Sequence, residues 1–101
     1  DMIVSAGENI YPAQIEAVLN GHPKVAESAV IGVPDALRGE VVAAYVVPSD
    51  DSLTTEELKA YCAQSPMLSS YKWPRVYHIV NELPHTATGK LMHYKLREAL
   101  G

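Results

Sequence analysis

Apolar residues follow a helical spacing in the stretch "YPAQIEAVLN". Ile15, Val18 and Leu19 stand at positions i, i+3 and i+4, which predicts a helix with one apolar face. Pro12 suits the first turn of a helix, because the N–H that proline lacks would have no partner there. The following "NGHP" contains Gly and Pro, and these predict the end of the helix.

Runs of β-branched residues predict strands. Residues 25–33 and 41–47 are two such runs, and the short, turn-rich connector "PDALRGE" favours antiparallel pairing between them. A third strand is predicted at residues 76–80. The opening "MIVSAGENIY" predicts a β-hairpin with its turn at residues 6–9, where Gly7 supplies the positive φ that a turn often needs.

A second helix is signalled at its beginning. Thr54 is a suitable N-cap, and Glu57 stands three residues later as its capping-box partner. Leu53 and Leu58 flank the cap as a hydrophobic staple. Cys62 shares a helical face with Leu58, so we expect a small buried side chain there and not a nucleophile.

A closing helix is predicted at residues 93–100, burying Leu96, Ala99 and Leu100. The succession of elements predicts a small α+β domain. It would consist of an antiparallel three-stranded sheet with packed helices, plus the N-terminal β-hairpin.

Composition limits the classes of function. The 101 residues carry a net charge of -4, which argues against nucleic acid or an anionic membrane as a partner. We find neither an apolar run long enough to span a membrane nor an opening signal peptide. Cys62 is the one cysteine, so we expect no internal disulfide and a cytoplasmic protein. Because the chain begins inside a strand-like segment, we expect it to be the end of a longer protein.

Positive charge gathers in the last third of the chain. From residue 72 onward only two acidic residues, Glu82 and Glu98, accompany the basic ones, which are Lys72, Arg75, Lys90, Lys95 and Arg97. This part of the molecule could face a small anionic ligand, although a solvated basic face gives the same pattern.

The stretch "LPHTATGK" ends in a Gly-Lys pair but is not a Walker A loop. Pro84 stands where the first glycine of that motif belongs, and Leu91 replaces the Mg²⁺-binding hydroxyl. Lys90 can still act as one mobile positive charge that stabilises a phosphoryl group, or it can be an ordinary exposed lysine. The four histidines lack metal-ligand spacing, so we expect no metal site in these residues.

Four stretches together resemble the C-terminal domain of AMP-forming acyl-CoA synthetases, within the adenylate-forming superfamily. They are "DMIVSAGENIYPAQIEAVL", "VPDALRGEVVAAYVV", "YKWPR" and "LPHTATGKLMHYKLR". The resemblance implies two half-reactions. A carboxylate first attacks the α-phosphate of ATP to give an acyl-adenylate, and after the small domain rotates, the thiol of CoA displaces AMP.

The resemblance also implies roles for individual residues. Lys90 matches the adenylation lysine, whose ammonium would bridge the carboxylate and the α-phosphate oxygens. Asp1 matches the hinge motif. The matches to positions that meet the pantetheine channel or the CoA nucleotide are Ala6, Gly7, Glu8, Arg38, Tyr71, Lys72, Trp73 and Arg75.

For the full-length enzyme the resemblance implies ATP, Mg²⁺ and CoA, a carboxylic acid substrate and an N-terminal domain as partner. We expect the isolated domain to bind none of these cofactors and to be inactive. Two alternatives stay open: a related enzyme that loads a carrier protein, and a free-standing binding or regulatory module.

Overall fold

The computed structural model describes residues 2–100 of the chain, with side chains up to residue 98. Five strands form one sheet in the order β2-β1-β4-β3, and β5 pairs with β4. The α+β class and the N-terminal hairpin are confirmed, whereas the predicted count of three strands in the sheet is wrong. The strands are β1 (Ile3–Ser5), β2 (Glu8–Ile10), β3 (Val25–Asp35), β4 (Gly39–Pro48) and β5 (Val76–Ile79).

The antiparallel β3–β4 hairpin is the framework of the sheet, as predicted. Its register runs from the Val25↔Pro48 pair to the Asp35↔Gly39 pair. The Asp35 carboxylate accepts hydrogen bonds from the backbone N–H groups of Leu37 and Arg38, which fixes the turn. Both strands extend beyond the predicted runs, because this compact turn lets the polar residues beside it pair as well.

The turn between β1 and β2 is tighter than the sequence predicted. Only Ala6 and Gly7 connect the two strands, and Glu8 and Asn9 already pair with β1. Both connecting residues have positive φ, 50° for Ala6 and 82° for Gly7, as the favoured two-residue hairpin turns of type I′ require. The hairpin joins the main sheet through the pair Ser5↔Gly39.

β5 pairs parallel to β4, so the expectation of an entirely antiparallel sheet is wrong for this pair. Residues 76–79 lie beside residues 43–46 of β4 in parallel register. The physical reason is the long connection through α2 (Thr55–Gln64) and the 3₁₀ helix η1 (Ser70–Lys72), which returns the chain to the end at which β4 began.

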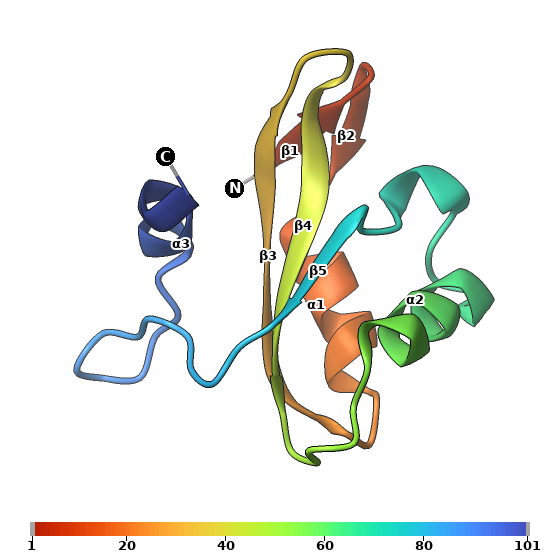
Figure 1. The fold of residues 1–101 in the computed structure, drawn as a ribbon. Coiled ribbons are helices and arrows are strands. Elements are labelled where there is room, and N and C mark those ends of the chain that lie inside the picture. The colour runs from red at the N-terminus through yellow and green to blue at the C-terminus, as the bar shows by residue number, and fades with distance from the viewer. Residues whose placement is uncertain (1, 101) are drawn as a thin grey trace.

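Each face of the sheet carries its own core. α1 (Pro12–Asn20) and α2 cover one face, while α3 (His93–Leu100) lies on the other side of the sheet (Figure 1). On the α1/α2 face the sheet contributes Val30 and Val42 to a core with Ile15 and Leu58. On the α3 face a smaller core includes Ile31, Ala43, Tyr45 and Leu83. Successive residues of β3 and β4 therefore point to opposite cores, as the pleat of a strand requires.

α1 and α2 begin where their local signals lie. α1 begins at Pro12, and α2 is capped by Thr54 and Glu57 in a complete capping box, worth about 1 kcal/mol for such a cap. Cys62 is fully buried, as predicted. Leu96 of α3 packs on the smaller core. The predicted burial of Ala99 and Leu100 lies outside the described side chains.

Candidate functional site

Lys90 lies on a closed loop between β5 and α3. Residues His85 and Leu91 pair across the base of the loop as an isolated antiparallel bridge. Inside it, the N–H of Thr86 donates to the carbonyl of Lys90 at 2.8 Å, and the N–H of Lys90 donates to Oγ1 of Thr86 at 3.0 Å. Gly89, with φ of 89°, makes the turn that closes the loop. The backbone of Lys90 is therefore fixed by its own loop.

The side chain of Lys90 projects from that fixed backbone toward solvent. It is exposed, and its ammonium group has no hydrogen-bond or ion-pair partner within the part of the chain that the structure describes. It lines a hollow of about 330 Å³ together with Thr86, Leu91, Met92, His93 and Tyr94. A free ammonium beside an open hollow is available to an anionic group from another domain or a ligand.

A second group of predicted residues meets at the end of the sheet. The turn of the β1–β2 hairpin lies beside the turn of the β3–β4 hairpin (Figure 1), and the N–H of Ala6 donates to the carbonyl of Arg38 at 2.9 Å. Ala6, Gly7 and Glu8 are exposed, and Arg38 is half-buried. The fold thus brings Arg38 to the other three residues, which lie 30 to 32 positions before it in sequence.

The "YKWPR" stretch forms a third group beside α1. Nζ of Lys72 donates to Oε1 of Gln14 at 2.9 Å and lies 5.6 Å from the centre of the Tyr71 ring. Trp73 is partly exposed, and the N–H of Arg75 donates to the carbonyl of Val42 in β4. The contact with Gln14 was not predicted, because nothing in the sequence near Lys72 signals that α1 lies beside it.

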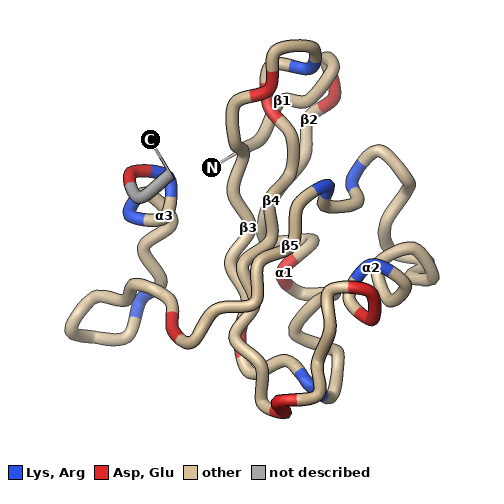
Figure 2. Tube along the Cα trace, in the orientation of Figure 1, with Lys and Arg blue, Asp and Glu red and all other residues tan. Residues whose placement is uncertain are grey.

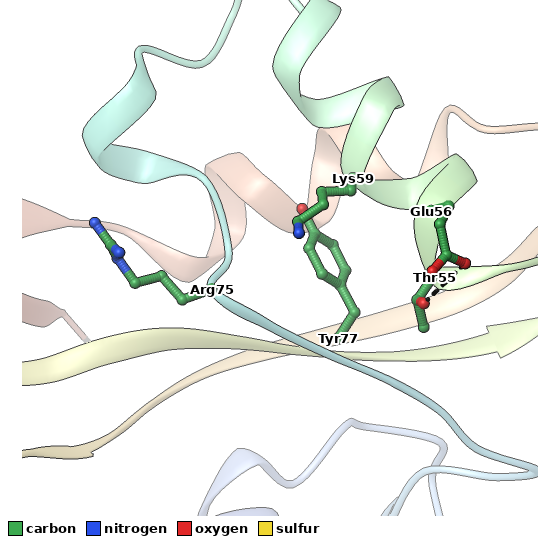
Figure 3. Close-up of a pocket in the computed structure, with 5 residues that line it drawn as sticks. All are labelled: Thr55, Glu56, Lys59, Arg75 and Tyr77. Carbon is green, nitrogen blue, oxygen red and sulfur yellow. Dashed lines mark hydrogen bonds between the residues drawn. The ribbon is translucent and has the colours of Figure 1, made fainter.

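A small hollow of about 190 Å³ lies between α2 and β5. Its lining residues are Thr55, Glu56, Lys59, Arg75 and Tyr77 (Figure 3). Lys59 lies beside the Tyr77 ring, whereas Arg75 points away from it. Sequence reasoning missed Lys59, since only the packing of α2 on β5 brings it near Arg75.

Burial raises two pKa values under this hollow. The pKa of the Cys62 thiol lies above its ordinary value because the side chain is buried. The pKa of the Tyr77 hydroxyl is raised as well, first by burial and then by its neighbour Cys62. Both groups are therefore neutral near pH 7, and Cys62 lacks the thiolate that a nucleophile needs.

The predicted residues thus form separate groups. The blue loop before α3, which carries Lys90, lies on the α3 side of the sheet, while the teal segment after α2, with η1, lies on the α1/α2 side (Figure 1). Figure 2 shows basic residues on α3 and on the loop before it, away from the other groups. Asp1 lies outside the described residues. Within residues 2–100 we find no cluster of three or more side chains suited to a metal ion, and no helix long and apolar enough to cross a membrane.

A family model and two relatives of known name point to the same family of enzymes. Residues 14–90 match the model of the AMP-binding enzyme C-terminal domain. The chain is 50% identical over 96 residues to a 2-succinylbenzoate–CoA ligase of Bacillus licheniformis, covering 95% of this chain and 20% of that protein. It is 46% identical over 98 residues to a long-chain-fatty-acid–CoA ligase of Yersinia pestis, covering 97% of this chain and 17% of that ligase.

Solved structures agree with the sequence relatives. A fatty acyl CoA synthetase of Mycobacterium tuberculosis superposes with a TM-score of 0.92 at 42% identity, covering 98% of this chain and 19% of that chain. The o-succinylbenzoate CoA synthetase of Bacillus subtilis, in complex with its acyl-adenylate intermediate, gives a TM-score of 0.88 at 41% identity, covering 96% and 19%. The chain spans about a fifth of the length of the relatives that it matches.

Proposed function

Because the chain belongs to the AMP-binding enzyme C-terminal domain family, we propose that it is the C-terminal domain of an ATP-dependent, AMP-forming acyl- or aryl-CoA ligase. The observation that carries this proposal is the 50% identity, over nearly the whole chain, to a CoA ligase. ATP, Mg²⁺, CoA and a carboxylic acid are then the reactants of the full-length enzyme, which we place in the cytoplasm. An N-terminal domain would hold the ATP and the acid.

Lys90 is the residue that we assign to adenylation. When the carboxylate attacks the α-phosphate, negative charge builds on the phosphoryl oxygens, and an ammonium group close to them lowers the barrier. The exposed, unpaired ammonium of Lys90 on a closed loop supports this role. A compact charge on a flexible stem can reach several oxygens at once, which a rigid guanidinium cannot do as readily.

We assign CoA binding to the turns of the β1–β2 and β3–β4 hairpins and to the "YKWPR" stretch. Exposed backbone at Ala6 and Gly7, with Glu8 beside them, would line the pantetheine channel. The cationic groups at Arg38, Lys72 and Arg75 would meet the nucleotide phosphates, while Tyr71 and Trp73 offer rings on which the adenine can stack. Since Lys72 already binds Gln14, it would have to exchange that partner for a phosphate.

Two half-reactions with different contacts explain why these groups lie apart. If the domain rotates at a hinge that includes Asp1, Lys90 can serve adenylation in one orientation and the CoA-facing residues can serve thioester formation in the other. The isolated domain, which lacks the ATP and acid pockets of its partner, would then catalyse neither step.

The test is acid-dependent pyrophosphate exchange by the full-length ligase that carries this chain. The probe acids are 2-succinylbenzoate and medium- and long-chain fatty acids, and the acceptors are CoA and a holo-carrier protein. Exchange with one of these acids, followed by transfer to CoA, supports the proposal. No exchange with any of these acids would contradict the proposal. Transfer only to the carrier protein would show that a carrier protein, and not CoA, is the acceptor.

A further inference from the structure

Two histidines to which the proposed function gives no role flank the Lys90 loop, and each contacts a glutamate. Nε2 of His85, at the start of the loop, lies 3.2 Å from Oε2 of Glu27 on β3. Nε2 of His93, the first residue of α3, lies 2.6 Å from Oε2 of Glu16 on α1. Both ends of the loop are thus held by side-chain contacts to elements of the main fold.

The Glu16 contact is built into the edge of the sheet. β3 is an edge strand, and the N–H of Val30 donates to the same Glu16 oxygen, Oε2, at 2.8 Å. The same Glu16 oxygen therefore accepts a hydrogen bond from a buried N–H of an edge strand and also contacts the imidazole ring of His93. The side chains of His93 and Glu16 are only 20% and 16% exposed, so water competes little for this contact.

The Glu27 contact holds the other arm of the loop. It is more exposed, with 32% of the His85 side chain and 38% of the Glu27 side chain accessible. This contact still restrains the loop in spite of its exposure, because His85 pairs with Leu91 at the base of the loop, next to Lys90. Restraining His85 therefore restrains both arms. Apart from these two contacts, the loop is attached through Leu83, which is buried just before it, through the partly buried Leu91 and through α3.

We propose that Glu16 and Glu27, through His93 and His85, are positioning residues that set the place of the Lys90 loop for adenylation. This inference rests on the proposed role of Lys90. A charge that must lie within hydrogen-bonding distance of a phosphoryl oxygen is sensitive to displacement, and about 1 Å of misplacement can cost a reaction about 100-fold. The loop's internal hydrogen bonds give it a shape, and the two histidine contacts give that shape a fixed location.

The experiment compares the two half-reactions in the full-length ligase. In a His85→Leu/His93→Leu double variant, which keeps bulk but removes both contacts, we expect acyl-adenylate formation to slow by about 10- to 100-fold. Formation of the thioester from supplied acyl-adenylate and CoA should keep the rate of the unchanged ligase, because that step does not use Lys90. His85→Gln/His93→Gln retains an N–H donor for each carboxylate and should recover most of the adenylation rate.

Loop position gives a second readout that does not depend on activity. A nitroxide attached at Ala87→Cys, an exposed loop residue, should become more mobile in the Leu double variant and not in the Gln double variant. The matched control is Lys24→Leu, which breaks an ion pair of 3.0 Å between Lys24 and Glu57 elsewhere in the domain. It should change neither the half-reactions nor the spin label.

Three results would contradict the inference. They are normal adenylation in the Leu double variant, equal losses in both half-reactions, and an unchanged spin label. Normal adenylation in Lys90→Ala would instead overturn the proposed function on which the inference rests, so the two failures are distinguishable.

Discussion

At the scale of single residues, Ala6 holds an unusual backbone conformation. Its φ of 50° lies in the left-handed region, where a Cβ atom crowds the following carbonyl. The tight β1–β2 turn, joined to the β3–β4 turn through the contact with Arg38, imposes this conformation. The strain therefore belongs to the end of the sheet that we assign to pantetheine.

Relief of that strain is measurable. We expect Ala6→Gly to raise the free energy of unfolding by about 0.5–1 kcal/mol, because the lost strain exceeds the added freedom of glycine in the unfolded chain. Gly7→Ala, at φ of 82°, should lower it by about 1 kcal/mol, although no atom beyond the two neighbouring residues lies within 4 Å of the new Cβ. Urea unfolding of the chain measures both, and shifts of the same sign would contradict this interpretation.

At the scale of elements, local signals were predictable and long-range pairing was not. The beginning of α2 follows from Thr54 and Glu57, which act within one turn. The parallel direction of β5 depends on where a connection of nearly 30 residues returns the chain, and no pattern within residues 76–80 encodes it. The extent of the β1–β2 turn was wrong because Glu8 and Asn9 suit a turn as well as a strand end.

The packing of α2 on β5 predicts a response to alkaline pH. Cys62 and Tyr77 have raised pKa values in the folded chain, so above pH 9 the native state holds protons that the unfolded state loses. The free energy of unfolding therefore keeps its full value below the unfolded pKa of each group. It falls as pH rises, first above about 9 because of Cys62 and then above about 10 because of Tyr77. Each group contributes at most about 1.4 kcal/mol per pH unit.

Urea unfolding at pH 8, 9, 10 and 11 measures this decline. Burial also raises the pKa of Tyr45, so Tyr77→Phe removes one of two tyrosines that contribute and should reduce, without abolishing, the decline above pH 10. Tyr71→Phe, at an exposed position, is the matched control and should keep the slope of the unchanged chain. Equal slopes in the chain and in Tyr77→Phe would show that Tyr77 does not carry the effect.

At the scale of the whole molecule, the sheet separates the loop that carries Lys90 from the "YKWPR" stretch. Lys90 stood out in the sequence because its loop motif is continuous. The contact between Glu16 and His93, which lie 77 positions apart, could not be predicted because only the folded edge of β3 brings them together. The histidines were considered in the sequence only as metal ligands, and their contacts with carboxylates appear only in the fold.

The proposed function depends most on the role of Lys90 in adenylation. The most direct measurement is acid-dependent pyrophosphate exchange by full-length ligase carrying Lys90→Ala, with Lys95→Ala on α3 as the matched control. We expect Lys90→Ala to lose at least about 100-fold in exchange, since a lost charge at the transition state has that effect. It should still form thioester from supplied acyl-adenylate, and Lys95→Ala should behave as the unchanged enzyme. Near-normal exchange in Lys90→Ala would contradict the claim.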